Sequence, residues 1–443
     1  MPRAGRPTLD ERRAAGKALR DQLPRTEQGT LALPGVRPDL VDRLKALNAR
    51  RLPHLLPIKW GRMAASPFGF FRGSAGLMAA DLGPAPVTGL QVQLCGDAHL
   101  LNLGAYAAPD GHLVFDLNDF DESLPGPWEW DLKRLCASVV LGGREAGQSD
   151  ASARDAVLAL VRSYREDMGR FAAMKGLELV RFDVVPEDHG PVLKEVLAKA
   201  TRDTPARLLD KVTELDGEGH RRFQSRPPLL TPIAPSLDKA LREGWGDYLD
   251  TVVPGRQRVL EGYEPVEIAF KVVGTGSVGT TCLLDLCFGR GPDDPLFLQL
   301  KSEEPSVWAP YLPGPADPIH QGRRAALGQH RMQTWVDPCL GWAQFGGQEF
   351  LVRQWSDHKA SVTVAALKGP LLEAYASLCG GILAKAHART GDAVRLAGYL
   401  GDGDKLDQAL GGFALAYADQ MERDHQAFLL AIQGGLLQAE PGV

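Results

Sequence analysis

The residue types that could do chemistry gather in two short acidic segments. Residues 96–102 read Gly-Asp-Ala-His-Leu-Leu-Asn, and residues 115–122 read Phe-Asp-Leu-Asn-Asp-Phe-Asp-Glu. The turn residues Pro109-Asp110-Gly111 lie between them, so we expect the two segments to lie side by side. Carboxylate and carboxamide oxygens gathered in this way suit a magnesium ion that carries substrate phosphates.

A glycine-rich turn is the third segment with chemical potential. Residues 271–280 read Lys-Val-Val-Gly-Thr-Gly-Ser-Val-Gly-Thr. A dinucleotide-binding fingerprint needs a helix after its glycines, whereas residues 280–286 are typical of a strand. Two strands joined by a glycine turn form the lid over ATP phosphates in kinases. The residues expected to bind the nucleotide here are Gly274, Gly276, Ser277 and Gly279.

Lys301 ends the next apolar strand, residues 296–301. Burying a lysine costs free energy unless an anion meets it, and in kinase-like proteins such a lysine holds nucleotide phosphates. Its usual partner is a helix glutamate, but the helix expected over residues 320–335 contains none. Glu303 and Glu304 are the substitutes, and a lysine that merely snorkels at the strand end is the alternative.

Composition is that of an ordinary globular protein of two or three lobes. The chain has 443 residues, 44% of them hydrophobic and 24% charged, and its net charge of −5 argues against a nucleic-acid surface. Its six cysteines show no zinc-binding spacing, which favours buried thiols in a reducing compartment. Residues 1–30 lack an apolar signal core, and no membrane-length apolar run occurs. We expect a cytoplasmic protein without a nucleic-acid or membrane partner.

The pattern of apolar residues predicts helices at both ends and a β-rich part between them. Short β-type runs at 92–95 and 112–117 suggest a hairpin that presents both acidic segments. The remaining segments are helices over 128–212, a loop or linker over 217–235, strands over 266–273, 280–288 and 296–301, a helix over 320–335, a hairpin over 340–355, and helices over 371–389 and 406–430.

Long blocks of the chain resemble a bacterial family catalogued as domain of unknown function 2252. They include residues 62–68, 96–99, 118–122 and 125–134, and further blocks at 274–279, 353–354 and 386–392. This resemblance implies no activity. Separately, the acidic segments are similar to the GDxHxxN, DF and WDL succession of aminoglycoside and choline kinase-like phosphotransferases.

The phosphotransferase likeness implies a catalytic role for Asp97, which would accept or orient the proton of an attacking hydroxyl, and a structural role for Asp131. His99 lies on the same loop and is a candidate for the same chemistry, although bracing the loop is the simpler role. For Asp97 the simpler role is a turn cap. Arg62 and Arg72 could bind a phosphate or an acidic substrate, and salt bridges to nearby carboxylates are an equal alternative.

The same likeness implies that Asn102 and Asp119 are the magnesium ligands. Asp121 is a further candidate, and Asp116 and Glu122 leave the choice of the second carboxylate open. A turn-forming asparagine is the competing view of Asn102.

The order of these parts is reversed relative to kinases, because the acidic segments precede the glycine turn. We therefore expect an α+β, circularly permuted protein kinase-like fold, with a mostly helical large lobe and a small antiparallel β lobe. Adenine would sit against a hinge at residues 354–358. The expected parts are a helical extension over 1–55, the large lobe over 56–255, the small ATP-binding lobe over 256–358, and C-terminal helices over 359–443.

The function expected from these parts is a Mg-ATP-dependent phosphotransferase that acts on a small-molecule or protein hydroxyl, with ATP and Mg²⁺ as cofactors. Transfer of AMP by the same site, and a nucleotide-binding regulator without catalysis, are the alternatives. A binuclear metal hydrolase is less favoured, because no GNH-type block or HxxH spacing occurs. The acceptor and the oligomeric state do not follow from the sequence.

Overall fold

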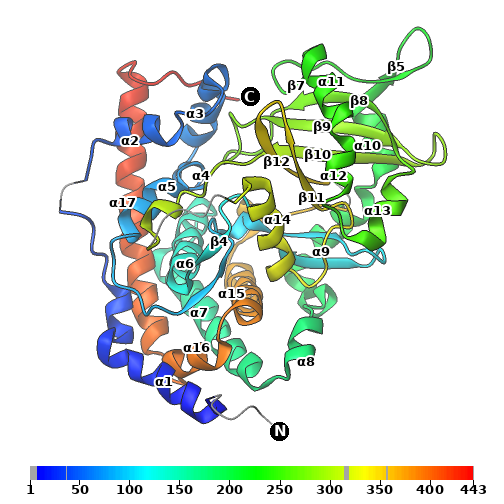
Figure 1. Ribbon diagram of the computed structural model, residues 1–443. Coiled ribbons are helices and arrows are strands. Elements are labelled where there is room, and N and C mark those ends of the chain that lie inside the picture. The colour runs from blue at the N-terminus through cyan, green and yellow to red at the C-terminus, as the bar shows by residue number, and fades with distance from the viewer. Residues whose placement is uncertain (1–6, 36, 314–318, 356–357, 443) are drawn as a thin grey trace.

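The computed structural model describes residues 7–35, 37–313, 319–355 and 358–442. Figure 1 shows a β-rich part at the upper right and a bundle of long helices at the left and below it. The prediction of a mixed α+β fold is confirmed at that level.

The main sheet has six antiparallel strands in the order β11-β12-β10-β9-β8-β7. Its strands are β7 (Leu230–Pro232), β8 (Glu264–Lys271), β9 (Cys282–Phe288), β10 (Pro295–Ser302), β11 (Gly341–Phe345) and β12 (Gln348–Gln354). Five of them lie where alternating or apolar runs predicted strands. The sixth, β7, comes from the segment that the sequence predicted to be a loop or linker.

Alternation along the strands separates the two faces of this sheet. On β10, Leu298 and Leu300 pack into one apolar core, while Phe297 faces the core on the other side. Gln299 and Lys301 share the face of Phe297 and are buried. The same alternation therefore sends the lysine of this strand away from the first core and towards the acidic segments.

Helices that precede β8 in the chain pack on this sheet. One face is covered by residues of α11 (Pro235–Glu243), α12 (Trp245–Leu249) and α13 (Pro254–Leu260), and the other by α10 (Pro205–Val212). A small hairpin, β5 (Thr213–Leu215) with β6 (Arg221–Phe223), follows α10. The sequence predicts residues 56–255 as the large lobe, and α10, α11 and α12 belong to that range.

The helical part surrounds one continuous apolar core that draws on residues from Leu44 to Leu437. Its helices before the sheet are α1 (Leu9–Gln22), α2 (Leu40–Leu47), α3 (Leu56–Ala64), α4 (Pro67–Gly73), α5 (Ala75–Leu82), α6 (Trp128–Glu145), α7 (Asp150–Ala173), α8 (Gly176–Arg181) and α9 (Gly190–Arg202). After the sheet come α15 (Pro370–Thr390), α16 (Ala393–Leu400) and α17 (Lys405–Gln433). Helix α14 (Gln321–Met332) lies between the two parts in Figure 1.

The acidic segments lie on two separate strand pairs. β1 (Gln91–Leu94) pairs with β4 (Leu124–Pro127), and β2 (Leu103–Ala107) pairs with β3 (Leu113–Leu117). The predicted hairpin between residues 92–95 and 112–117 is therefore wrong. The expectation that the two segments lie side by side is met by the β1–β4 pairing, which returns the chain to the start of the first segment.

The C-terminal end of α15 lies against β1, although about 300 residues separate them in the sequence. The backbone N–H of Gln93 donates to Oγ1 of Thr390 over 3.1 Å. A Cβ on Gly391 would lie 2.9 Å from the carbonyl oxygen of Gln91. The end of this helix and the start of the strand that leads to the acidic loop are thus immediate neighbours.

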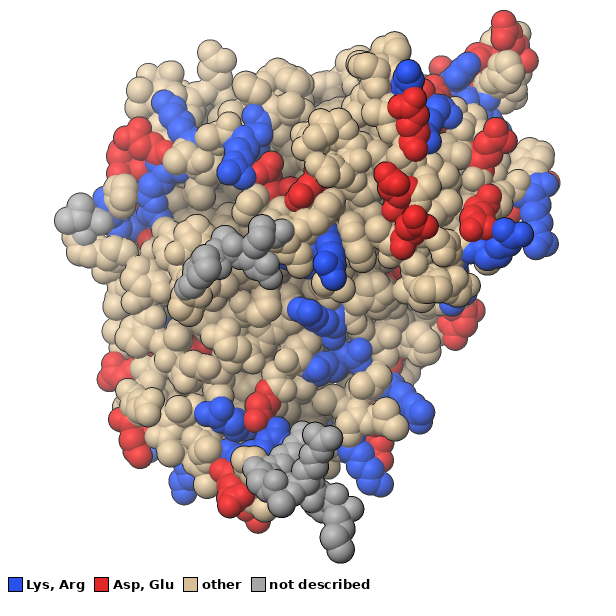
Figure 2. Space-filling model, in the orientation of Figure 1, with Lys and Arg blue, Asp and Glu red and all other residues tan. Residues whose placement is uncertain are grey.

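Among the described residues, no helix is both long and apolar enough to cross a membrane. The face of the molecule in Figure 2 carries acidic and basic side chains with many uncharged residues between them.

Candidate functional site

A cavity of about 660 Å³ lies where the two parts of the molecule meet. Its walls include Gly276 and Ser277 from the glycine turn together with Asp97, Asp119 and Asp121 from the acidic segments. The remaining candidate residues do not line this cavity: His99, Asn102, Lys301, Gly274 and Gly279. The structure thus brings the two distant groups of candidate residues to one space.

Asp97 is held by an arginine that the sequence analysis did not single out. Arg134 of α6 is fully buried and places Nε 2.6 Å and Nη2 2.5 Å from Oδ1 of Asp97. The same guanidinium lies over the ring of Phe71 and donates to the Phe71 carbonyl over 3.1 Å. A carboxylate paired with a buried guanidinium in this way is fixed in one position, which suits it to orienting a hydroxyl group.

His99 stabilises the loop on which Asp97 lies. Its Nδ1 accepts the backbone N–H of Leu101 over 3.1 Å, and its Nε2 lies 3.9 Å from Oδ2 of Asp97, too far for a hydrogen bond. Burial lowers the pKa of His99 to about 4, and the nearby arginines act in the same direction. The imidazole is therefore neutral at pH 7.

Two further contacts fix the backbone of the acidic loop. The carboxylate of Asp131 accepts the backbone N–H groups of Cys95 and Gly96 over 2.8 and 2.9 Å. The side-chain amide of Asn102 donates to the carbonyl of Asp97 over 2.7 Å. Asn102 thus has the turn-forming role, because its side-chain nitrogen closes the loop. Its side-chain carbonyl oxygen remains as its acceptor atom.

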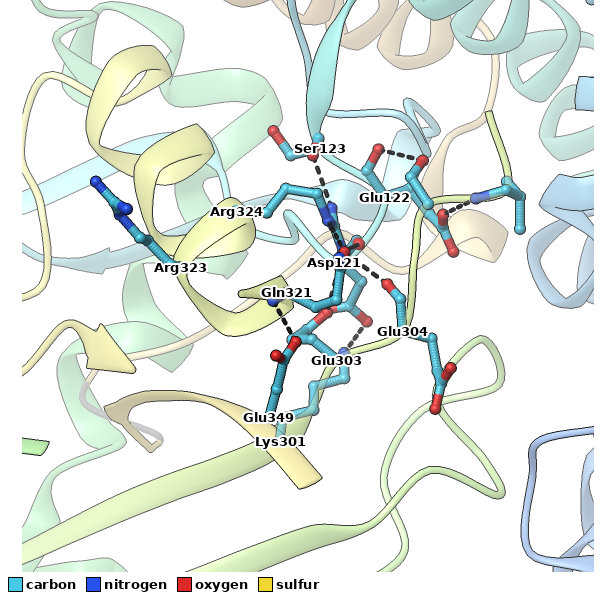
Figure 3. Close-up of polar contacts among 12 residues, drawn as sticks. Asp121, Glu122, Ser123, Lys301, Glu303, Glu304, Gln321, Arg323, Arg324 and Glu349 are labelled. Atoms are coloured by element: carbon cyan, nitrogen blue, oxygen red, sulfur yellow. Dashed lines mark hydrogen bonds and ion pairs between the residues drawn. The ribbon is translucent and has the colours of Figure 1, made fainter. Parts of the chain in front are cut away.

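Asp121 and Lys301 form the ion pair at the centre of the site (Figure 3). Lys301 Nζ also lies 3.7 Å from Oδ1 of Asp119. Burial alone would raise the pKa of Asp121. The Lys301 ammonium, through its charge and its hydrogen bond, outweighs this effect and holds the pKa of that carboxyl well below its usual range. Burial and repulsion by Asp121 raise the pKa of Asp119.

Glu303 and Arg324 complete the surroundings of this pair (Figure 3). Glu303 is buried, its pKa is raised well above the usual value by burial, and Asp121 adds to that effect. Arg324 of α14 donates to the backbone carbonyls of Asp121 over 2.6 Å and of Ser123 over 2.7 Å. Where a kinase helix would contribute a glutamate to the lysine, this helix contributes an arginine to the backbone of the acidic segment.

The glycine turn is held through its carbonyl oxygens by basic residues that precede α4 in the chain. Arg51 Nη1 donates to the carbonyl of Val278 over 2.6 Å. The Lys59 ammonium lies 3.4 and 3.3 Å from the carbonyl oxygens of Thr275 and Gly276. Among the described residues, the N–H groups of residues 274–279 donate no hydrogen bond. The turn therefore has its carbonyls engaged and its amides available to an anion.

Two of the extra acids do not present a free carboxylate to the cavity. Asp116 is buried in an ion pair with Lys385 of α15 and does not line the cavity. Glu122 lines it, but its Oε2 accepts the N–H of Val307 over 2.7 Å, and burial raises its pKa. Of the carboxylates considered as magnesium ligands, Asp119 and Asp121 thus remain as the two that line the cavity and are not held by a hydrogen bond from the backbone.

Each of these two carboxylates keeps one oxygen that accepts no hydrogen bond from the described residues. Oδ1 of Asp119 and Oδ1 of Asp121 are both buried and lack a hydrogen-bond partner. Within the described part of the chain, no three His, Cys, Asp or Glu side chains form a complete metal-binding cluster. A magnesium ion that uses one or two protein carboxylates and completes its shell with water and phosphate is compatible with both observations.

A second cavity, of about 410 Å³, opens on the other side of Asp119. Asn118, Arg353 and residues 360–363 line it with Asp119, which is therefore common to both cavities. Arg353 donates to the carbonyl of Asn118 over 2.9 Å. The predicted hinge at 354–358 borders this region, although residues 356 and 357 of that hinge lie outside the described residues.

Several basic residues of the site have no role predicted from the sequence, among them Arg51, Lys59, Arg134 and Arg324. A signal existed for Arg134, because it follows Asp131 by three positions and so shares its helix face towards the acidic loop. No local pattern identifies Lys59 or Arg324. Their contacts join segments that are about 200 residues apart in the chain.

The family described as "Uncharacterized protein conserved in bacteria (DUF2252)" matches residues 51–431, so the chain belongs to this family. No curated protein matches the sequence. No solved structure matches it either.

Proposed function

We propose that this protein is a Mg-ATP-dependent phosphotransferase that acts on a hydroxyl group. The observation that carries the proposal is the cavity lined by both the glycine turn and the acidic segments. Among the residues that the structure describes, it offers backbone N–H groups that donate no hydrogen bond, and it offers one oxygen each of Asp119 and Asp121 that accepts none. A nucleotide triphosphate with its cation needs both kinds of group within a few ångströms.

Different residues of the site would bind the phosphates and the magnesium ion. Lys301 and the amides of residues 274–279 would hold the phosphates, and Asp119 and Asp121, with the carbonyl oxygen of Asn102, would hold magnesium. The ion, when bound, neutralises charge on the phosphates. The acceptor oxygen forms a bond to the terminal phosphorus, the bond to the bridging oxygen breaks, ADP leaves with that electron pair, and the hydroxyl proton passes to Asp97 or to water.

The Asp97–Arg134 pair suits a loose transition state. In such a state the acceptor proton is lost late, and orientation matters more than basicity. Arg134 holds Asp97 in one position, and Asp131 holds the backbone of the same loop. The proposal therefore assigns Asp97 chiefly to orienting the acceptor.

The contact between α15 and β1 supports a circularly permuted order. In the standard order the catalytic loop follows the small lobe and its first large-lobe helix. Here a short connection from Thr390 to Gln91 would restore that order, because the end of α15 already contacts the start of β1. Circular permutation needs neighbouring ends of this kind.

A regulator without catalysis is the second candidate. Helix α14 brings no glutamate to Lys301, and the lysine is already engaged by Asp121. The same pairing would also be displaced by a bound cation and triphosphate, so we rank this candidate second.

Product analysis distinguishes the candidates. The purified chain is incubated with Mg-ATP and a panel of hydroxyl compounds, and nucleotide products are separated by chromatography. We expect ADP, whereas pyrophosphate would indicate AMP transfer and tight binding without turnover would indicate a regulator. Asp119→Asn is expected to abolish ADP formation, while Asp110→Asn, an exposed aspartate outside the cavity, should leave it unchanged. Full activity of Asp119→Asn would contradict the metal assignment.

A further inference from the structure

Arg72 is a cation of the cavity wall that lacks a partner. It lies in the last turn of α4 and is one of the residues that line the cavity, together with Asp97 and Asp119. Its Nε is buried without a hydrogen-bond partner. Among the described residues, no hydrogen bond from its side chain and no carboxylate within 4.0 Å of it is found.

The other arginines of this cavity are engaged. Arg50 pairs with Glu304 over 2.9 Å, and Arg51 donates to the turn carbonyl of Val278. Arg134, which lies behind Asp97, is paired with it. Burial lowers the pKa of Arg72, and Asp97, Glu145 and Asp119 only partly oppose that effect. A partly desolvated guanidinium without an anion is costly, so a bound anion would relieve that cost.

The glycine turn lies directly beside Arg72. A Cβ on Gly276 would lie 3.5 Å from the backbone carbonyl of Arg72. On the same side, Lys59 is 1% exposed, contacts the carbonyls of the turn, and has no carboxylate within 4.0 Å among the described residues. Arg72 and Lys59, two basic residues without ionic partners in the described part of the chain, therefore both lie next to the glycine turn, and burial lowers the pKa of Lys59.

We infer that Arg72 binds the terminal phosphoryl group of the nucleoside triphosphate, from the wall opposite the magnesium ligands. This inference rests on the proposed function and adds a ligand for the group that is transferred. A guanidinium presents several N–H donors to phosphate oxygens in a fixed plane, which makes it suited to a phosphoryl group that passes from an anhydride bond in ATP to an ester bond on the acceptor. Lys59 positions the turn behind it.

The inference predicts discrimination between nucleotides by their terminal phosphate. Binding of Mg-ATP and Mg-ADP to the full chain is measured by isothermal titration calorimetry. Arg72→Gln is expected to weaken Mg-ATP binding about 10-fold or more and to leave Mg-ADP binding within about 2-fold of wild type. Arg72→Lys keeps the positive charge but loses the planar set of N–H donors. Its affinity for Mg-ATP should lie between those of wild type and Arg72→Gln.

Arg50→Ala is the matched control, because Arg50 lines the same cavity but is mostly exposed and already paired. It should leave both affinities unchanged. Equal losses for ATP and ADP in Arg72→Gln, or no loss for either, would overturn the inference while leaving the proposed function intact. Failure of the wild-type chain to bind either nucleotide would overturn both. Unchanged thermal unfolding of Arg72→Gln establishes that the variant is folded.

Discussion

Replacing Lys301 with methionine is expected to lower the free energy of unfolding by about 3 kcal/mol in the absence of nucleotide. Lys301 is 4% exposed and compensates Asp121 directly and Asp119 at 3.7 Å. Removing one partner of a buried ion pair costs about 3–5 kcal/mol, because the other charge is left uncompensated. Asp121 is 25% exposed, so water offsets part of the loss and the lower end applies.

The assay is urea-induced unfolding followed by tryptophan fluorescence at pH 7. Lys239→Met is the matched control, because Lys239 is 75% exposed and pairs only with Glu243 one helical turn away. It should change stability by less than about 0.5 kcal/mol. The double variant Lys301→Met with Asp121→Asn should recover part of the loss, since it removes both members of the pair.

Two results would refute this reasoning. One is a stability of Lys301→Met equal to that of Lys239→Met. The other is additive losses in the double variant, which would mean that Lys301 and Asp121 are not coupled. Nucleotide binding must be absent in this assay, because a bound triphosphate would supply a different partner for Lys301.

Three further predictions concern other parts of the molecule. Burial raises the pKa of Asp285 to about 7 in the folded state, from an ordinary value of 3.8, so its contribution to stability is full below about pH 4 and is lost as the pH rises through 7. Asp285→Asn should therefore reduce the change of the urea midpoint with pH between pH 4 and 7. It should also raise the free energy of unfolding at pH 8, by about 4 kcal/mol at most. A variant whose midpoint depends on pH as in wild type would contradict this prediction. Lys385→Met should lower the unfolding free energy by about 3–5 kcal/mol, because it leaves Asp116 buried without its partner, and a urea midpoint equal to wild type would be inconsistent with this pair. Arg324→Ala should weaken Mg-ATP binding in calorimetry by about 10-fold or more, because it frees the backbone of Asp121 and Ser123, whereas Arg323→Ala, its neighbour on α14, should bind as wild type; equal behaviour of the two variants would reject that role.

The strands of the β-rich part could be predicted because local patterns specify them. Apolar runs at strand length predicted β8, β9 and β10 within a few residues, and a pair of glycines marked the β11–β12 hairpin. The lysine at the end of β10 could be recognised as unusual because it ends an apolar run of strand length. It is buried because both faces of this strand are covered.

Pairings between distant segments could not be predicted in this way. β4 is a four-residue strand that contains two prolines and a glycine, so nothing local marks it as the partner of β1. The partner of Lys301 lies 180 positions away and belongs to the acidic segment, not to the helix where a glutamate was sought. In the sequence, Lys59 is an ordinary residue of an amphipathic helix. Its contact with the glycine turn arises only in the fold.

The most direct test of the central claim is a crystal structure of the chain with a non-hydrolysable ATP analogue and magnesium. We expect one triphosphate in the cavity, with amides of residues 274–279 on one side and a magnesium ion bound by Asp119 or Asp121 on the other. A nucleotide bound in another cavity, or one that contacts the turn while the acidic segment remains paired with Lys301, would contradict the account.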